Sequence, residues 1–341
     1  MVQSILMSQT RSERTFSFMN SLRLFFTGFA MGAADIVPGV SGGTMAFILG
    51  IYEELIYSIK VMSGEVIALG IRGRIREAWQ KIPFAFLFPL GFGLLAAIGS
   101  LSKVIAFLLH DYPSFIWSFF FGLVIASIVV VRKRVVTWDI QDYGIMGVTA
   151  IVAYLLVGVI PVETPNNLLI TFLSGAIAIC AMILPGISGS FLLVILGKYE
   201  QILQAVLTYD FLTLGVFAAG AALGLALFSR VLSWLFRYYH DVTVAALIGF
   251  MIGSLRKVWP WKEVLVTRLN SHGELVTVVD KNILPSVFNL EVFLCIILCV
   301  AGVLLILFLD RMHGTKERTE DIENKRFQKD FATALKNQKH K

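Results

Sequence analysis

Apolar residues in this 341-residue chain form long runs separated by short polar stretches. The runs are too continuous for the stripes of amphipathic helices, and several approach the roughly 20 residues that span a hydrocarbon core of about 30 Å. We count five apolar segments in each half. They are 24–37, 45–59, 83–109, 115–131 and 143–160, then 168–184, 191–206, 211–236, 242–255 and 290–309. The pattern predicts an all-α polytopic membrane protein.

One motif occurs twice, at the start of the second segment in each half. Residues 34–53 read ADIVPGVSGGTMAFILGIYE, and residues 181–200 read AMILPGISGSFLLVILGKYE. From Pro38 to Glu53 the copies agree at nine of sixteen positions. Chance would give about one or two, at common residue frequencies of roughly 7%. The chain therefore contains two copies of one unit, and we expect membrane repeats at 21–160 and 161–310.

Basic residues are distributed unequally among the polar stretches. Residues 60–81 and 132–134 are rich in Lys and Arg, whereas 110–114 and 161–167 contain none. The positive-inside rule places the first two stretches in the cytoplasm and the other two outside. Because each half has five segments, an odd number, the second half starts on the opposite side, and the repeats should be inverted. The stretch 256–286 should then be external, although it carries five basic residues.

The two ends of the chain are polar. Residues 1–20 do not resemble a signal peptide, and we expect a cytoplasmic N-terminal segment. Residues 311–341 hold nine Lys or Arg against five Asp or Glu, so 9 − 5 = 4 of the net charge of +6 lies in a basic tail that we also expect in the cytoplasm. The cysteines, Cys180, Cys295 and Cys299, lie in apolar runs, which favours neither disulfides nor a metal site.

The first apolar segment is too short to cross a membrane. Residues 24–37 would form about 21 Å of helix at 1.5 Å per residue, against a core of about 30 Å. No charged loop separates this segment from the next. We therefore expect a re-entrant hairpin with its tip at 38–43, a second hairpin at 168–206 entering from the opposite face, and about three transmembrane helices per repeat. Ten full crossings would give the same topology at the chain ends.

The two tips have the chemistry of an anion site. Non-helical backbone at membrane depth must line a protein or water-filled cavity, and the glycines allow close approach of a ligand. Helices that begin after Gly42 and Gly189 would direct free N–H groups into that cavity, which suits phosphate. Close packing of small residues is the alternative. The candidate phosphate-binding residues are Gly39, Ser41, Gly42, Gly43, Thr44, Gly186, Ser188, Gly189 and Ser190.

Charged residues extend the candidate site. At a separation of 127 residues, Lys103 matches Arg230 inside the third segments, where a cation suggests a counter-ion for the anion or, alternatively, snorkelling to the interface. Glu53 and Glu200 end the motif and could pair with these cations, carry a coupling proton, or simply lie at the interface. Asp35, whose counterpart is a methionine, could be protonated when the anion binds, or could cap a helix.

The stretches ADIVPGVSGGTMAFILGIYEELI and MILPGISGSFLLVILGKYEQIL resemble the PopT-type bacterial polyprenyl-phosphate translocases. The resemblance covers nearly all of residues 20–310. It implies recycling of undecaprenyl phosphate, the carrier lipid of cell-wall and surface-polysaccharide precursors, from the outer to the inner leaflet of the cytoplasmic membrane. The residues themselves predict only an anion site in an inverted-repeat membrane protein.

Two other classes compete with this interpretation. Undecaprenyl-pyrophosphate phosphatases have a similar motif, Pro-Gly-x-Ser-Arg-Ser-Gly, but the position of its arginine is Gly42 or Gly189 here. The paired catalytic glutamates of those enzymes also lack an evident counterpart, because Glu53 and Glu54 are adjacent and cannot share a helix face. A transporter of a small soluble anion fits the residues almost as well as a lipid transporter. We expect a lipid-phosphate translocase rather than an enzyme, and we expect it to work by alternating access. Coupling to protons or sodium would use Asp35 or Glu53. We expect membrane lipids as partners and neither a cofactor nor nucleic acid.

Overall fold

The computed structural model describes residues 18–37, 41–135, 137–159, 164–165, 167–269, 275–285 and 287–311, with main chain alone at 266–269 and 275–279. Three of our sequence predictions therefore lie outside the described residues. They are most of the N-terminal segment, the basic tail beyond Arg311, and the candidate residue Gly39.

The first half is helical and follows the predicted segments closely. Its elements, in chain order, are α2 (Phe18–Ile36), α3 (Gly42–Ile48), α4 (Tyr52–Val61), η1 (Met62–Val66), α5 (Ile67–Ile71), α6 (Ile75–Lys81), α7 (Phe84–Asp111), α8 (Pro113–Arg132) and α9 (Ile140–Val157).

The second half repeats this order without counterparts of η1, α5 and α6 among its described residues. Its elements are α10 (Leu168–Ile183), α11 (Gly189–Ile195), α12 (Tyr199–Leu207), α13 (Phe211–Tyr238), α14 (His240–Ser254), β1 (Lys262–Leu269), β2 (Leu275–Asn282) and a C-terminal helix, Leu290–Arg311.

The second predicted segment of each half is two helices rather than one. α3 and α4 are separated near Gly50, and α11 and α12 near Gly197, where the chain bends by 108°. Both glycines have positive φ, 75° and 63°, a conformation that ends helices and that other residues adopt at a cost. The prediction of one continuous segment in each half was wrong. Apolar residues continue through both breaks, so the hydrophobic pattern did not reveal them.

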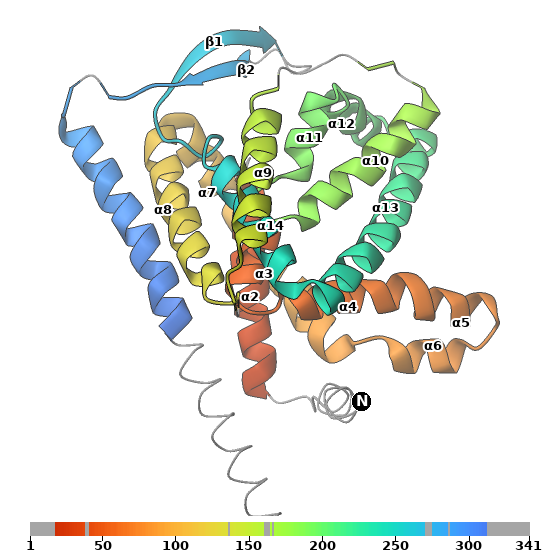
Figure 1. The fold of residues 1–341 in the computed structure, drawn as a ribbon. Helices are drawn as coiled ribbons and strands as arrows, with labels where there is room; N and C mark the ends of the chain where they lie inside the picture. The colour runs from red at the N-terminus through yellow and green to blue at the C-terminus, as the bar shows by residue number, and fades with distance from the viewer. Residues whose placement is uncertain are drawn as a thin grey trace, which may run out of the picture.

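The basic stretch after α4, which we described from the sequence only as a polar stretch between apolar segments, is helical. η1, α5 and α6 form an arm that projects from the helical body (Figure 1). The turn between α5 and α6 contains Gly73 at φ 71°, and ion pairs join Lys81 to Glu65 and Arg74 to Glu77. Ile71 and Trp79 are exposed, so the arm presents both charged and apolar side chains.

The stretch before the C-terminal helix forms an antiparallel hairpin. β1 and β2 pair from Lys262 opposite Asn282 to Leu269 opposite Leu275. The hairpin lies across the end of the molecule opposite the start of α2 and the end of the C-terminal helix (Figure 1). The protein is therefore mostly helical, and the prediction of an all-α chain is corrected at this one element.

Matching glycines pack matching helices together. A Cβ atom on Gly93 of α7 would lie 2.8 Å from the carbonyl carbon of Phe25 in α2. A Cβ atom on Gly220 of α13 would lie 2.7 Å from the carbonyl carbon of Phe172 in α10. Real Cβ atoms do not approach so closely, so only glycine allows the two helix pairs to pack at these distances. The two halves thus use the same contact at equivalent positions.

The last helix of each half packs against the other half. A Cβ atom on Gly122 of α8 would meet the backbone of Cys299 in the C-terminal helix, and one on Gly249 of α14 would meet Met146 of α9. Figure 1 shows α8 and the C-terminal helix descending while α9 and α14 rise. The two halves are therefore interlocked.

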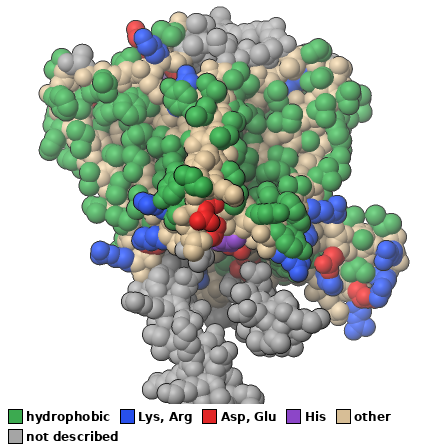
Figure 2. Space-filling model, in the orientation of Figure 1, with side chains coloured by type: hydrophobic (Ala, Val, Ile, Leu, Met, Phe, Trp, Pro, Cys, Tyr) green, Lys and Arg blue, Asp and Glu red, His purple; other side chains and the backbone are tan. Residues whose placement is uncertain are grey.

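Five described helices are long and apolar enough to cross a membrane, namely α7, α8, α9, α13 and the C-terminal helix. α11 and α12 would make a sixth span if the bent pair crosses as one, and α10 and α14 are shorter apolar helices. Figure 2 shows apolar side chains over the body of one face and Lys and Arg side chains gathered along its lower edge. This is the surface of a multi-pass membrane protein.

Candidate functional site

The two copies of the motif meet where the first helix of each half ends. The Ser41 hydroxyl donates a hydrogen bond to the carbonyl of Met182 at 3.0 Å. In the other direction, the N–H of Gly186 donates to Oγ1 of Thr44 at 2.9 Å. Ser41 and Thr44 are 1% and 2% exposed, so both bonds join the halves inside the protein.

Gly43 and Tyr52 hold the end of α10. A Cβ atom on Gly43 would lie 2.6 Å from the carbonyl oxygen of Ile183, which requires glycine there. The Tyr52 hydroxyl donates to the same oxygen at 3.1 Å, and its buried ring packs edge-on against Phe47 and Phe236. The repeated motif therefore includes a hydrogen bond from Tyr52 to the other half of the chain. We had not assigned Tyr52 a role from the sequence.

Gly186 places the second loop against α14. Its φ is 91°, and a Cβ atom would lie 2.7 Å from Oγ of Ser254 and 3.1 Å from the carbonyl of Phe250. Both the backbone conformation and the space therefore require glycine.

In the first motif, side chains of the chain itself bind the free N–H groups at the start of α3. Asp35 accepts a hydrogen bond from the N–H of Gly42 at 2.6 Å, and Ser41 accepts one from the N–H of Gly43 at 3.1 Å. The N–H of Thr44 donates to the Ser41 carbonyl. These N–H groups were expected to bind an external anion. In this structure a carboxylate of the chain itself lies at the start of α3, because Asp35 is one helical turn before the loop.

In the second motif, no described side chain caps the start of α11 in this way. Met182 stands in the position of Asp35, and Ser188 precedes α11 without capping it through its side chain. Instead the Ser188 and Ser190 hydroxyls lie 2.7 Å apart. The described residues provide no acceptor for the N–H groups of Gly189 and Ser190. One of these hydroxyls donates to the other, which leaves one hydroxyl proton and two N–H groups at one helix start as donors for an anion.

Lys103 and Arg230 lie on exposed helix surfaces, and among the described residues no hydrogen bond or ion pair joins either side chain to a motif. The Arg230 guanidinium instead approaches Gly64 in η1. Lys103 and Arg230 are each ten residues beyond Gly93 and Gly220, the glycines that face the neighbouring helix. At 100° per residue, each cation therefore points about 80° away from that face. The sequence identified equivalent cations, but the structure does not bring them to the candidate site.

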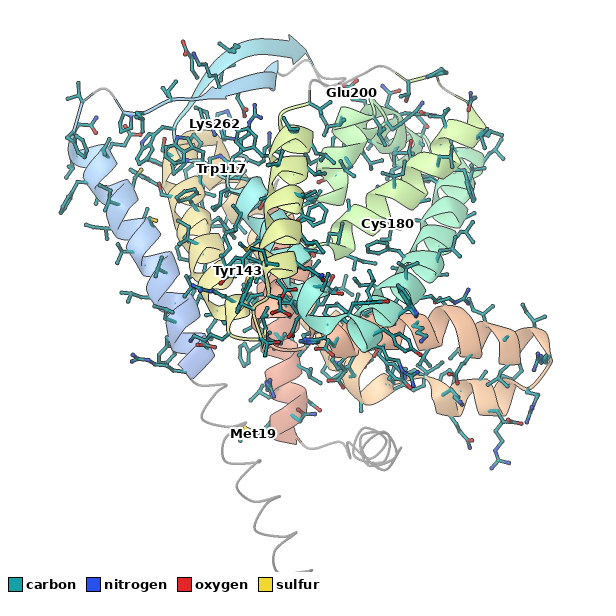
Figure 3. The ribbon with its side chains drawn as sticks, viewed as in Figure 1. Met19, Trp117, Tyr143, Cys180, Glu200 and Lys262 are labelled. Atoms are coloured by element: carbon teal, nitrogen blue, oxygen red, sulfur yellow. The ribbon has the colours of Figure 1, made fainter. Side chains whose placement is uncertain are left out.

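The two motif glutamates have different surroundings. Oε1 of Glu53 is 3.6 Å from Nε2 of His240, whose Nδ1 is 3.0 Å from Asp241. Glu53 therefore pairs with a histidine at the start of α14 rather than with Lys103 or Arg230. Glu200 is exposed at the start of α12, close to the hairpin end of the molecule (Figure 3).

Sequence reasoning missed a buried lysine inside the second motif. Lys198 is 0% exposed, and its ammonium donates to the carbonyl of Pro165 at 2.7 Å and to Oε1 of Gln201 at 2.8 Å. The corresponding residue in the first half is Ile51. The difference between the two copies at this position, lysine in one and isoleucine in the other, is the feature of the sequence that could have identified Lys198.

The different capping of α3 and α11 predicts unequal effects of equivalent substitutions. Ser41→Ala removes both a cap bond and a bond to the other half, and should lower the free energy of unfolding by about 2 kcal/mol. Ser188→Ala removes no cap bond and should cost less than about 1 kcal/mol. Thermal unfolding of both variants in detergent, relative to wild type, tests this. Equal losses would contradict the assigned capping.

A multi-pass membrane protein whose two halves join through a repeated motif is the class that the fold and the site define. The family model described as "VCA0040-like: Undecaprenyl phosphate translocase-like" matches residues 31–276. The chain belongs to this family.

Two curated relatives support the assignment. A protein of Vibrio cholerae named polyprenyl-phosphate transporter is 41% identical over 299 residues, covering 86% of this chain and 97% of the relative. A Staphylococcus aureus protein of the same name is 35% identical over 266 residues, covering 72% and 87%. These names indicate a transporter rather than an enzyme. No solved structure matches the chain.

Proposed function

We propose that this protein translocates undecaprenyl phosphate from the outer to the inner leaflet of the bacterial cytoplasmic membrane, so that the carrier lipid can be used again. Membership of the family and the names of both relatives support this substrate. The observation that carries the proposal is the pair of hydrogen bonds, Ser41 to Met182 and Gly186 to Thr44, that joins the two motifs inside an apolar body.

A polar site inside the membrane is needed because a phosphate headgroup is strongly disfavoured in hydrocarbon, whereas the polyprenyl chain is not. We place the headgroup at the boundary between the motifs and leave the chain in lipid. In this proposal α2–α3 and α10–α11 are re-entrant hairpins that enter from opposite faces of the membrane, as in other inverted repeats. The opposite directions of matched helices in Figure 1 support this arrangement.

The second motif binds the headgroup in this scheme. When the bond between the Ser188 and Ser190 hydroxyls breaks, both hydroxyls and the N–H groups of Gly189 and Ser190 donate to the phosphate oxygens. The first motif becomes available when Asp35 leaves the N–H of Gly42. Protonation of Asp35 weakens its acceptor strength, which links headgroup binding at the first motif to a proton.

Alternating access follows from exchange between these two states. Rocking of one half against the other breaks the bonds from Ser41 and to Thr44 and moves the headgroup from the second motif to the first. Glu53 with His240 is a second candidate for proton or sodium coupling. Lys103 and Arg230 meet the headgroup on its approach and departure. We propose cytoplasmic termini, because the α5–α6 arm and Arg132–Arg134 carry the basic residues at that end of the molecule.

The function is tested in liposomes that contain purified protein and undecaprenyl phosphate. We expect protein-dependent loss of phosphate headgroups from one leaflet, with no phosphate released from undecaprenyl pyrophosphate assayed alongside. Ser188→Ala combined with Ser190→Ala should slow headgroup loss at least tenfold. Ser100→Ala is the matched control, because its hydroxyl bonds only to carbonyls of its own helix, and it should leave the rate unchanged.

Other outcomes point to other classes. Phosphate release from the pyrophosphate would make the protein a phosphatase. Movement of soluble phosphate without lipid movement would make it a transporter of a small anion. Equal rates for the double variant and Ser100→Ala would exclude the second motif as the binding site.

A further inference from the structure

The hairpin end of the molecule carries cations that the translocation site does not use. The loop before β1 and the two strands contain five basic residues, on the side that the positive-inside rule keeps poor in them; these are Arg256, Lys257, Lys262, Arg268 and Lys281. We call the base of the hairpin, formed by residues 257–262 together with Asp280, the hairpin root; Lys281 is exposed and lies outside it.

The hairpin root is packed onto two membrane helices. The Lys262 ammonium lies 4.9 Å from the centre of the Trp117 ring in α8, and Figure 3 shows the two side chains together beneath the hairpin. The Lys257 ammonium lies 4.7 Å from the centre of the Phe191 ring in α11. Phe191 directly follows Ser190, so the root adjoins the helix that begins with the second motif.

The root has more positive than negative charge. Oδ2 of Asp280 is 3.2 Å from the Lys262 ammonium and 3.8 Å from that of Lys257, so two cations share one carboxylate. The Lys262 side chain is only 13% exposed. The pKa of Lys262 is lowered to about 8, mainly by burial and also by the charge of Lys257, while Asp280 partly opposes both effects. An additional anion here would stabilise the charged form of Lys262.

A buried donor in the same root has no acceptor. Nε1 of Trp261 is buried and unbonded among the described residues, whereas Nε1 of the neighbouring Trp259 donates to the Ile283 carbonyl at 2.9 Å. A buried N–H without a partner is unfavourable and rare in folded proteins. Because this N–H has almost no accessible surface, an acceptor oxygen of a ligand would reach it only when the side chains of the root move apart.

The surroundings of the root favour an amphiphile. Leu284, Val287 and Phe288, which follow β2, are 76%, 67% and 82% exposed. Tryptophans beside exposed apolar side chains are typical of the boundary between headgroups and acyl chains. A ligand with an anionic head and an apolar chain can therefore contact the lysines and the lipid-facing residues at once.

We propose that the hairpin root, through Lys257, Lys262 and the Trp261 indole, is a reception site for the phosphoryl headgroup of a membrane lipid. The headgroup binds here first and then reaches the second motif along α11. This inference rests on the proposed function, because it assumes that the same lipid is subsequently translocated.

The test uses the full chain in phosphatidylcholine nanodiscs. Because Trp117, Trp259 and Trp261 surround the root, tryptophan fluorescence should report binding as undecaprenyl phosphate is added at low mole fraction. We expect a saturable change whose midpoint shifts at least tenfold in Lys257→Gln combined with Lys262→Gln. Trp261→Phe, which keeps the ring but removes the N–H, should also weaken binding. Lys281→Gln is the matched control, an exposed lysine on the same hairpin, and should bind like wild type.

The kinetic arm uses liposomes. The double lysine variant should translocate slowly at low lipid fraction and regain the wild-type rate at saturation, whereas a merely destabilised variant would lose the maximal rate too. Equal midpoints for the double variant and Lys281→Gln would overturn the reception site. Inorganic phosphate that gives the same change at the same concentration would overturn the lipid assignment. Binding at the root without translocation by wild type would instead refute the proposed function alone.

Discussion

Replacing Gly93 by alanine is expected to lower the free energy of unfolding by about 3 kcal/mol. The new Cβ atom would lie 2.8 Å from the carbonyl carbon of Phe25 and 2.9 Å from the backbone nitrogen of Phe29. These are main-chain atoms of α2, so a side-chain rotation cannot relieve the clash and the two helices must separate along their contact. Thermal unfolding of the purified variant in detergent measures the loss.

Gly91 provides the matched control for this substitution. It lies in the same helix two residues earlier, and a Cβ atom there would meet nothing within 4 Å. Gly91→Ala should therefore leave stability unchanged or raise it by up to about 1 kcal/mol, because alanine favours helix over glycine. Gly220→Ala should reproduce the loss in the second half, against Gly215→Ala as its control. Equal unfolding temperatures for Gly93→Ala and Gly91→Ala would refute the packing of α2 on α7.

Replacing Thr44 by valine is expected to reduce translocation at least tenfold while leaving the protein folded. Valine has the shape of threonine but cannot accept the hydrogen bond from the N–H of Gly186, which would be left buried and unpaired at a cost of about 1–3 kcal/mol. That cost falls on the contact between the two motifs, which the proposed mechanism makes and breaks in every cycle. Initial rates in liposomes and unfolding temperatures in detergent separate the two effects.

Thr44→Ser controls for the loss of the hydroxyl. It retains the acceptor and removes one methyl group, so it should translocate within about twofold of wild type, a barrier change below about 0.5 kcal/mol. Wild-type rates for the valine variant would show that the bond between Gly186 and Thr44 has no part in transport.

The repeat in the sequence anticipated much of this architecture. Offsets of 147 and 127 residues pair Phe25 with Phe172 and Gly93 with Gly220, and the same atoms meet in both halves. Similar sequences fold into similar contacts, so the helix pairs were predictable in principle once the repeat was seen. Helices were also predicted to begin after Gly42 and Gly189, and in the structure they begin one residue earlier, at these two glycines.

Other features depended on information that one sequence does not carry. The break at Gly50 lies in an apolar run, and composition alone does not reveal its positive φ. Lys103 and Arg230 were chosen for their charge, but whether a side chain faces the site depends on how its helix is rotated in the bundle. Asp35 differs again, since capping was one of its two predicted roles and its bond to Gly42 is the one that the structure shows.

The exchange of last helices between the halves has a mechanical consequence. α8, α9, α14 and the C-terminal helix form a frame in which each half holds the other, through the contacts of Gly122 with Cys299 and of Gly249 with Met146. Neither half can be withdrawn from this frame without exposing its helix contacts. The pairs α2–α7 and α10–α13 lie outside it and carry one motif each. In the alternating access that we propose, the rocking would therefore move α2–α7 relative to α10–α13, while the contacts of Gly122 and Gly249 keep the frame assembled.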